Sequence, residues 1–150
     1  MKTTATLLIL MCFNVLSVFS QQSLELSIKE NSDEPTSKTE HYYLLEVKNT
    51  SRQTEIFSIA AQNSVCSDNE RSAQVELIQD IFNKDKRTAL SSISLRAGES
   101  YQFYVKISRS QNTKLDKWNC TNISAVSSSR VQLSNAITIK TFIPNPKNFN

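Results

Sequence analysis

The sequence predicts an all-β protein that folds as an antiparallel sandwich of two sheets with about seven strands. Short segments alternate apolar and polar residues with a period of two, as strands with one buried face do. Polar stretches rich in turn-forming residues separate these segments, and no run of helices interrupts the series. The chain has no internal repeat and no low-complexity linker, so a single domain over residues 21–150 is expected.

Alternation defines three strands in the first half of the chain. In each of them apolar side chains occupy every second position, and polar side chains stand between them. These segments lie at residues 24–28, 43–47 and 57–61. A polar stretch containing Pro35 separates the first two, and a turn-like stretch that begins at Asn49 separates the second from the third.

The segment from Val75 to Phe82 fits two patterns. Val75 and Leu77 suit a strand, whereas the apolar residues from Leu77 to Phe82 would also form a helical stripe. The neighbouring segments are strands, and residues 83–86 resemble a turn. We therefore predict a strand from Val75 to about Gln79.

The clearest pair of strands flanks Gly98, the only glycine of the chain. Ile93 and Leu95 precede it, and apolar residues then take every second position from Tyr101 to Ile107. Gly98 is expected to form a turn with positive φ, which other residues adopt only at a steric cost. A chain with one glycine also lacks the glycine-rich loops that bind phosphates.

Two further alternating segments close the series at residues 118–127 and 137–143, before Pro144 ends regular structure. The side chains that point to one face of each strand should together form the core. Our candidates for it are Tyr43, Val47, Phe57, Phe103, Val105, Ile137 and Ile139.

Residues 1–20 have the anatomy of a secretory signal peptide. A positive start is followed by an apolar run, and cleavage is expected between Ser20 and Gln21. This run is too short and wrongly flanked for a transmembrane segment, and no later run approaches the length of one. A lipid-modified Cys12 fits less well, because Met11 stands where a small residue is needed. We therefore expect an exported protein, either secreted, periplasmic or at the cell surface.

Cys66 and Cys120 are the only cysteines that remain after this cleavage. A pair of cysteines in an exported chain is most simply one disulfide, because that compartment is oxidising. Two free buried thiols are the alternative. Two cysteines and a single histidine cannot fill a tetrahedral metal site, so no metal and no cofactor are expected.

Two stretches resemble the fibronectin-III-like and immunoglobulin-like sandwich modules of secreted bacterial proteins. Residues 45–50 resemble a strand that ends in an Asn-containing turn, and residues 56–59 the next strand with an inward Phe. Residues 93–107 resemble the glycine turn and the alternating strand of the same modules. This resemblance implies a binding, spacing or adhesion role and carries no catalytic residues. Because Cys66 and Trp118 depart from antibody-type positions, we expect the disulfide to join a loop to a strand.

The leading functional hypothesis is an exported, non-catalytic sandwich with a binding, adhesion or structural role at the cell envelope or outside the cell. A sheet edge or the end loops would contact a protein or glycan partner. The formal net charge of +3 is too small and too mixed to predict nucleic-acid binding. A carbohydrate-binding module is the alternative, with ligand contacts by Tyr42, Tyr104 and Trp118. A small hydrolase or inhibitor is a third possibility, but no arrangement of titratable residues supports it.

Other polar residues are interpreted as structural. His41 has no nucleophile and acid in a recognisable arrangement, and acidic pairs such as Asp33-Glu34 are expected to be solvated loop charges. Three Asn-X-Ser/Thr triplets begin at Asn49, Asn119 and Asn122. They would be glycosylation acceptors in a eukaryotic secretory pathway. The composition favours a bacterial protein, in which these triplets are accidental.

Overall fold

A computed structural model describes residues 22–66 and 74–149 of the chain. The expected signal peptide, with its cleavage between Ser20 and Gln21, lies outside these residues. The described part contains eight strands and a short 3₁₀ helix. Their bounds are β1 Leu24–Glu30, β2 Glu40–Asn49, β3 Glu55–Ser64, β4 Ile78–Phe82, β5 Ile93–Leu95, β6 Ser100–Ser108, β7 Lys117–Val126, β8 Ile137–Ile143 and η2 Pro146–Phe149.

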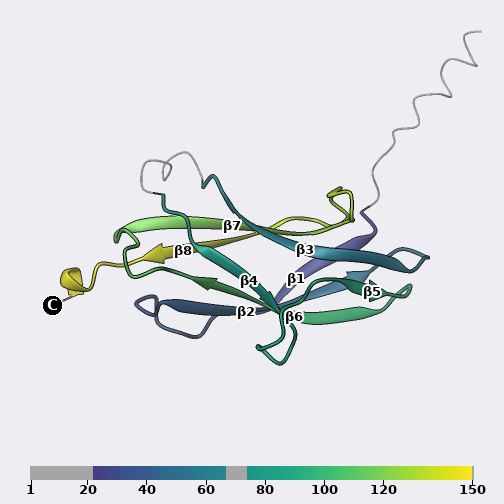
Figure 1. Cartoon of the computed structure of the whole chain (residues 1–150), viewed down its shortest axis with the longest axis horizontal. Helices are drawn as coiled ribbons and strands as arrows, with labels where there is room; N and C mark the ends of the chain where they lie inside the picture. Colours follow the sequence, from purple (N-terminus) through teal and green to yellow (C-terminus); the bar gives the residue numbers. More distant parts are fainter. Residues whose placement is uncertain (1–21, 67–73, 150) are drawn as a thin grey trace, which may run out of the picture.

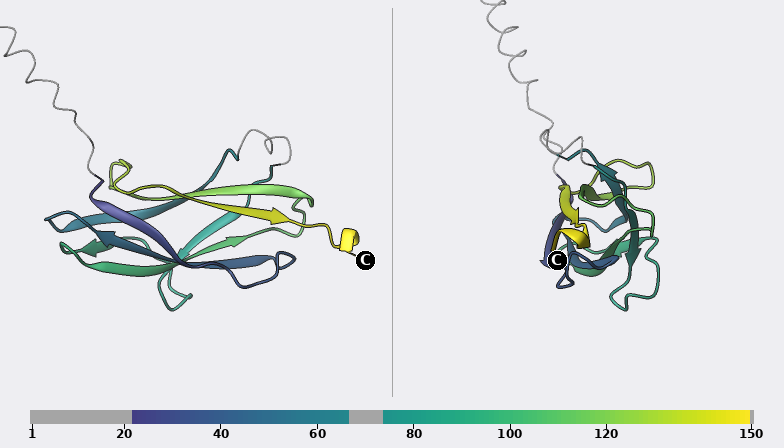
Figure 2. Two further views of the ribbon diagram at one scale, coloured as in Figure 1. Left: turned by 180° about the vertical axis from the view of Figure 1, so that it is seen from behind. Right: turned by 90° about the vertical axis from the view of Figure 1, so that its left-hand side faces the viewer.

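The strands form two four-stranded sheets, which confirms the predicted all-β sandwich. One sheet has the strand order β1-β2-β6-β4 and the other has the order β5-β3-β7-β8. Every pair of neighbouring strands is antiparallel. Figures 1 and 2 show β7 and β8 along one side of the elongated domain and β2 and β6 along the other.

The two sheets face each other across a core of apolar side chains. Among the predicted core residues, Phe103, Val105 and Val47 are 0% exposed, and Phe57 is 2% exposed. Tyr43 and Ile139 are also buried, while Ile137 is only partly buried against the same cluster. The alternation of the central strands therefore identified the inward face correctly, because a period of two leaves only one face apolar.

The prediction of a strand from Val75 to Gln79 is wrong in its bounds. Residues 74–77 cross from one sheet to the other: Gln74 forms an isolated bridge with Trp118 of β7, and the chain then joins β6 as strand β4. Strand β4 begins only at Ile78 and runs to Phe82. The expected turn at residues 83–86 is confirmed, since the Lys86 amide donates a hydrogen bond to the Asn83 carbonyl.

Gly98 has a φ of +78°, as its place in the predicted turn requires. Its amide donates a hydrogen bond to the Asn49 carbonyl, and the Asn49 amide donates to Glu99. This reciprocal pair joins the β5–β6 turn to the end of β2. A Cβ at position 98 would meet no atom within 4 Å, so the backbone angle, and not space, is what favours glycine there.

Cys66 and Cys120 are joined by a disulfide, with a distance of 5.4 Å between their Cα atoms. Cys66 follows β3 and Cys120 lies in β7, so the bond joins a loop to a strand of the same sheet, as expected. In the chain-entropy model a loop of this length stabilises the folded state by roughly 4 kcal/mol. Over residues 22–66 and 74–149 no helix has the length and apolar character needed to cross a membrane.

Replacement of Phe103 by Ala should lower the free energy of unfolding by about 3–5 kcal/mol, because the ring is completely buried between the sheets. Urea denaturation measures this loss. The matched control is Ile56→Ala: its side chain is 68% exposed, so the change should stay within about 0.5 kcal/mol. A loss below about 1 kcal/mol for Phe103→Ala would contradict the assigned inward face.

Candidate functional site

Tyr42 and Tyr104 lie next to each other on the outer face of the β1-β2-β6-β4 sheet. Tyr42 belongs to β2 and Tyr104 to β6, and these two strands are directly paired. Their ring centroids are 6.5 Å apart, with an angle of 78° between the ring planes. Both rings are half-buried. The structure therefore brings these two predicted contact residues together, but their edge-to-face arrangement is not a flat stacking platform.

Lys86 covers this pair of rings. Its Nζ lies 4.3 Å from the centroid of Tyr104 and 5.3 Å from the centroid of Tyr42. An ammonium group at this distance is attracted by the negative face of an aromatic ring. Lys86 lies in the turn between β4 and β5 with a φ of 59°, and its side chain reaches Tyr104 on the outer face of β6. The sequence identified the turn but not its contact with the tyrosines.

Asp85 holds the turn that carries Lys86. Its Oδ1 accepts hydrogen bonds from the amides of Arg87 and Thr88, at 2.8 and 2.9 Å. Its Oδ2 accepts a third bond, from the hydroxyl of Thr88, at 2.7 Å. The hydrogen bonds from the Thr88 and Arg87 amides lower the pKa of Asp85 to about 2. The ionised carboxylate therefore stabilises this turn at neutral pH.

The two tyrosines and Lys86 form one wall of a pocket of about 360 Å³, which we call the tyrosine pocket. Residues 30–34 form the opposite wall, and Leu44 forms the floor between them. Leu44 is only 6% exposed although it lies on the outer face of the sheet. The two walls cover it, and this departs from the expectation that each outer face is polar.

Three carboxylates line the tyrosine pocket, from Glu30, Asp33 and Glu34. Elsewhere on this face two acidic groups are paired: Glu46 with Lys29 at 2.9 Å, and Asp80 with Lys106 at 3.1 Å. Within the described ranges no ion pair involves the three pocket carboxylates. Asp33 and Glu34 are exposed loop residues, as the sequence predicts, and the folded β1–β2 loop places them at the same pocket as Tyr42 and Tyr104.

The ion pairs on the same face shift two pKa values. The hydrogen bond from Lys29 is the main cause of the lowered pKa of Glu46, and the Gln102 amide adds to it. The hydrogen bond to Asp80 is the main cause of the raised pKa of Lys106. Both shifts favour the charged forms, so this surface keeps its paired charges around the tyrosine pocket at neutral pH.

Trp118, the third predicted contact residue, lies on the other sheet. It belongs to β7 and packs against Phe142 of β8, with 4.9 Å between the ring centroids. Lys140 Nζ lies 4.8 Å from the centroid of the Trp118 ring. Trp118 is therefore separated by the whole sandwich from Tyr42 and Tyr104, and the three aromatic residues do not form a single surface.

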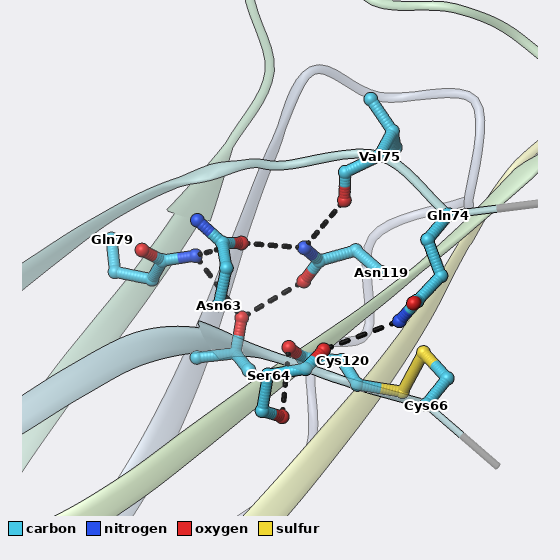
Figure 3. The surroundings of a disulfide bond; sticks show 9 residues. Asn63, Ser64, Cys66, Gln74, Val75, Gln79, Asn119 and Cys120 are labelled. Atoms are coloured by element: carbon cyan, nitrogen blue, oxygen red, sulfur yellow. Dashed lines mark hydrogen bonds between the residues drawn. A yellow bond between two sulfur atoms is a disulfide. The ribbon is translucent and has the colours of Figure 1, made fainter. Parts of the chain in front are cut away.

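The end of the domain that holds the disulfide has a polar interior instead of an apolar one (Figure 3). Asn63 Oδ1 accepts hydrogen bonds from the Leu77 amide, from Gln79 Nε2 and from Asn119 Nδ2. Asn119 Nδ2 also donates to the Val75 carbonyl at 2.9 Å. These bonds hold the segment that crosses between the sheets, because its backbone groups have few strand partners there.

Two of the three glycosylation triplets are closed to modification in the folded protein. Asn49 is 0% exposed and Asn119 is 1% exposed. The Nδ2 atom of each, to which a glycan would be attached, donates to backbone carbonyls. The Asn122 side chain is partly buried, and its Oδ1 has no hydrogen-bond partner. The burial of Asn49 and Asn119 supports the interpretation of these two triplets as accidental.

His41 and the acidic residues of the described segments form no metal-binding arrangement. His41 is 6% exposed, and its Nδ1 lies 3.2 Å from the hydroxyl oxygen of Ser32. Among residues 22–66 and 74–149, no group of three or more His, Cys, Asp or Glu side chains is placed to hold a metal ion. His41 instead links the start of β2 to the β1–β2 loop.

No family model matches this chain, and no curated protein is significantly similar to it in sequence. Among solved structures, the chain is similar to the crystal structure of a FixG-related protein from Vibrio parahaemolyticus. The TM-score is 0.51 at 11% sequence identity, and the match covers 82% of this chain and 97% of that one. At this identity the similarity supports the sandwich fold alone.

Replacement of Asn119 by Asp should destabilise the protein by more than about 3 kcal/mol at pH 7, because a carboxylate cannot donate to Val75 or Asn63 and would be buried beside two acceptors. Thermal and urea unfolding measure the loss, which should shrink as the new carboxyl is protonated at low pH. Asn83→Asp is the control, because Asn83 uses its oxygen to accept a bond from Tyr101 and Asp retains that acceptor. Equal effects at both positions would contradict the donor role of Asn119.

The carboxyl group of Asp85 should titrate with a midpoint at about pH 2, below its ordinary value of 3.8. Because its pKa is lowered in the folded state, the carboxylate stabilises the turn fully above pH 3.8, and this contribution disappears as the pH falls through 2. Carboxyl-carbon NMR measures the midpoint, and the Tyr104 ring resonances should shift with it as Lys86 leaves. The Asp85→Asn variant should lack this transition, and a midpoint near 3.8 would contradict the assignment.

Proposed function

We propose that this chain is an exported, non-catalytic binding module, and that its partner docks at the tyrosine pocket. The tyrosine pocket is the main support for this proposal. Two half-buried aromatic rings and three carboxylates line it, and these carboxylates form no ion pair within the described ranges. Aromatic rings supply contact area at a low entropic cost, and unpaired charges are left for a partner to neutralise.

Export is supported by the disulfide and by the signal-like residues 1–20. Disulfides persist in oxidising compartments and are rare in the cytosol. The Cys66–Cys120 bond is buried, with both residues at most 5% exposed. A location in the periplasm, at the cell surface or outside the cell follows from this proposal.

The strand order supports the resemblance to immunoglobulin-like modules. In constant-type domains one sheet has the order ABED and the other has the order CFG. Here β1-β2-β6-β4 corresponds to ABED, and β3-β7-β8 corresponds to CFG. Strand β5 is an additional edge strand next to β3. Such sandwiches commonly present binding surfaces on a rigid frame, which agrees with a binding role.

The sheet edges are less suited to a partner than the pocket. On the free side of β1, Leu26 donates its amide hydrogen to Asn135 Oδ1 and accepts a bond from Asn135 Nδ2. This side chain occupies the positions that an added strand would use. The edge strands β4 and β5 have five and three residues, and Pro144 follows β8 directly. We therefore favour the tyrosine pocket over pairing at an edge.

The chemistry of the pocket favours a cationic group on a protein partner. The described residues of the lining have three carboxylates and only one ammonium group, that of Lys86, so their net charge is negative. A basic side chain of the partner would meet the carboxylates of Glu30, Asp33 and Glu34. The proposal includes no catalytic role, because His41 is buried against Ser32 and serves the β1–β2 loop.

A glycan is the second candidate, and one observation favours it. Tyr42 and Tyr104 share a pocket with carboxylates, the groups that stack on sugar rings and hydrogen-bond sugar hydroxyls. The edge-to-face rings and the covering Lys86 would have to rearrange before a sugar could stack.

A photo-crosslinking amino acid at position 86 tests the proposal in the exporting cell. It should yield a protein adduct, and neutralising the pocket by Glu30→Gln, Asp33→Asn and Glu34→Gln should remove that adduct, because these three exposed side chains supply the charge. The control position is Thr138, which is exposed on the opposite sheet. Intact-mass analysis of the exported protein checks that it begins at Gln21 and is lighter by two hydrogen atoms, as a disulfide requires.

Absence of an adduct at position 86, or equal adducts at 86 and 138, would contradict docking at the pocket. A glycan array distinguishes the second candidate. Binding to a glycan that is lost in Tyr104→Ala would favour the carbohydrate-binding function over a cationic protein partner.

A further inference from the structure

A small cavity lies between the two sheets, at the end of the domain where β2 begins and β6 and β8 end. Figure 1 shows the ends of these strands together at the side of the C-terminus. We call it the end cavity. Its volume is about 10 Å³, which is room for one water molecule or one monatomic ion. A molecule of several heavy atoms would not fit there.

Two residues that line the end cavity each have a buried polar atom without a hydrogen-bond partner among the described residues. Thr141 points inward from β8 and is only 7% exposed, and its Oγ1 has no hydrogen bond. The Nη1 atom of Arg109 is also buried without a partner, although its Nη2 donates to the Ser37 carbonyl at 2.8 Å. Because a buried polar atom without a partner is costly, two such atoms at one cavity indicate that something bridges them.

The charge around the end cavity is positive. Arg109 and Lys38 line it, together with several hydroxyl groups. No Asp or Glu occurs among the described residues of its wall. In the same described part of the chain Arg109 forms no ion pair. A guanidinium hydrogen can only donate, and a Thr hydroxyl can donate as well, so the two unpartnered groups both offer hydrogens.

We propose that the end cavity binds a single small monovalent anion of the size of chloride, held by Arg109 Nη1 and Thr141 Oγ1. The anion satisfies both buried donors and neutralises a guanidinium group that pairs with no carboxylate of the described residues. A neutral water molecule would satisfy the hydrogen bonds but would leave the charge uncompensated.

The anion would also order the β1–β2 loop. Arg109 already binds this loop twice, because its amide donates to the Thr39 carbonyl and its Nη2 donates to Ser37. Thr36, Lys38 and Thr39 line the end cavity, while residues 30–34 of the same loop line the tyrosine pocket. A bound anion therefore orders the loop at its end-cavity part, next to the part that lines the tyrosine pocket. The anion site does not depend on the proposed partner, and it stands if no partner docks.

Thermal unfolding of the purified protein in sodium chloride, compared with sodium gluconate at equal ionic strength, tests the proposal. A ligand that binds only the folded state raises the unfolding temperature with its concentration. We expect a rise in chloride that saturates, and none in gluconate, whose anion is too large for the end cavity. Equal unfolding temperatures in the two salts at every concentration would overturn the proposal and leave a water molecule in the cavity.

Thr141→Val supplies the matched variant, because it removes the hydroxyl and retains the shape of the side chain. The chloride concentration at half-saturation should rise roughly tenfold, as expected for one lost hydrogen bond to a charged group. Thr138→Val is the control from the exposed face of the same strand and should leave the chloride dependence unchanged. An unchanged chloride dependence in Thr141→Val would also overturn the site.

If Thr141→Val does not fold, crystals of the unaltered protein soaked in sodium bromide test whether an anion occupies the end cavity. Anomalous scattering should show a bromide between Arg109 Nη1 and Thr141 Oγ1. Density without an anomalous signal at that position would identify a water molecule and contradict the anion site.

Discussion

The pairing of β2 with β6 positions both the apolar core and the tyrosine pocket. The two strands are in register from Glu40 opposite Ser108 to Lys48 opposite Ser100. Their inward side chains, among them Val47, Phe103 and Val105, are completely buried. Since alternate residues of a strand point to opposite faces, the same register places Tyr42 and Tyr104 together on the outside. The burial of one face of β2 and β6 thus determines which side chains of these strands lie on the outer surface.

Polar side chains bind backbone groups at the places where the sandwich has neither a neighbouring strand nor an apolar core. At the disulfide end, Asn63 and Asn119 bind the backbone that crosses between the sheets. At the first half of β1, Asn135 takes the place of a neighbouring strand by bonding both the amide and the carbonyl of Leu26. Each of these side chains satisfies backbone groups that would otherwise be unpaired at an edge or a crossing. The abundance of Asn in the chain therefore has a structural explanation at these positions, and at Asn49 and Asn119 it accounts for the glycosylation triplets as well.

The β1–β2 loop connects the two sites proposed for this protein. One part of it faces the tyrosine pocket, and the other faces the end cavity. His41 and Arg109 attach the loop to the ends of the two central strands, through Ser32 and through Ser37 and Thr39. A binding surface built on such a loop is positioned by the rigid pair β2–β6, which limits the ordering needed when a partner binds.

The residues alone predict the all-β class, the inward residues of the central strands, the turn at Gly98 and the pairing of Cys66 with Cys120. These features depend on local periodicity, on one glycine and on the only two cysteines after residue 20, and all of them can be recognised in a linear chain. The start of β4, the position of Trp118 and the contacts at the tyrosine pocket follow only from the folded structure. The crossing at residues 74–77 moved the start of β4, because backbone bonds to β7 and Asn63 replaced strand pairing there. The arrangement of the strands in two sheets places Trp118 on the opposite sheet from the tyrosines, and it brings Lys86 and the acidic loop together at one pocket. No local pattern encodes these contacts, since they join strands and loops that are far apart in the chain and depend on which sheet each strand enters.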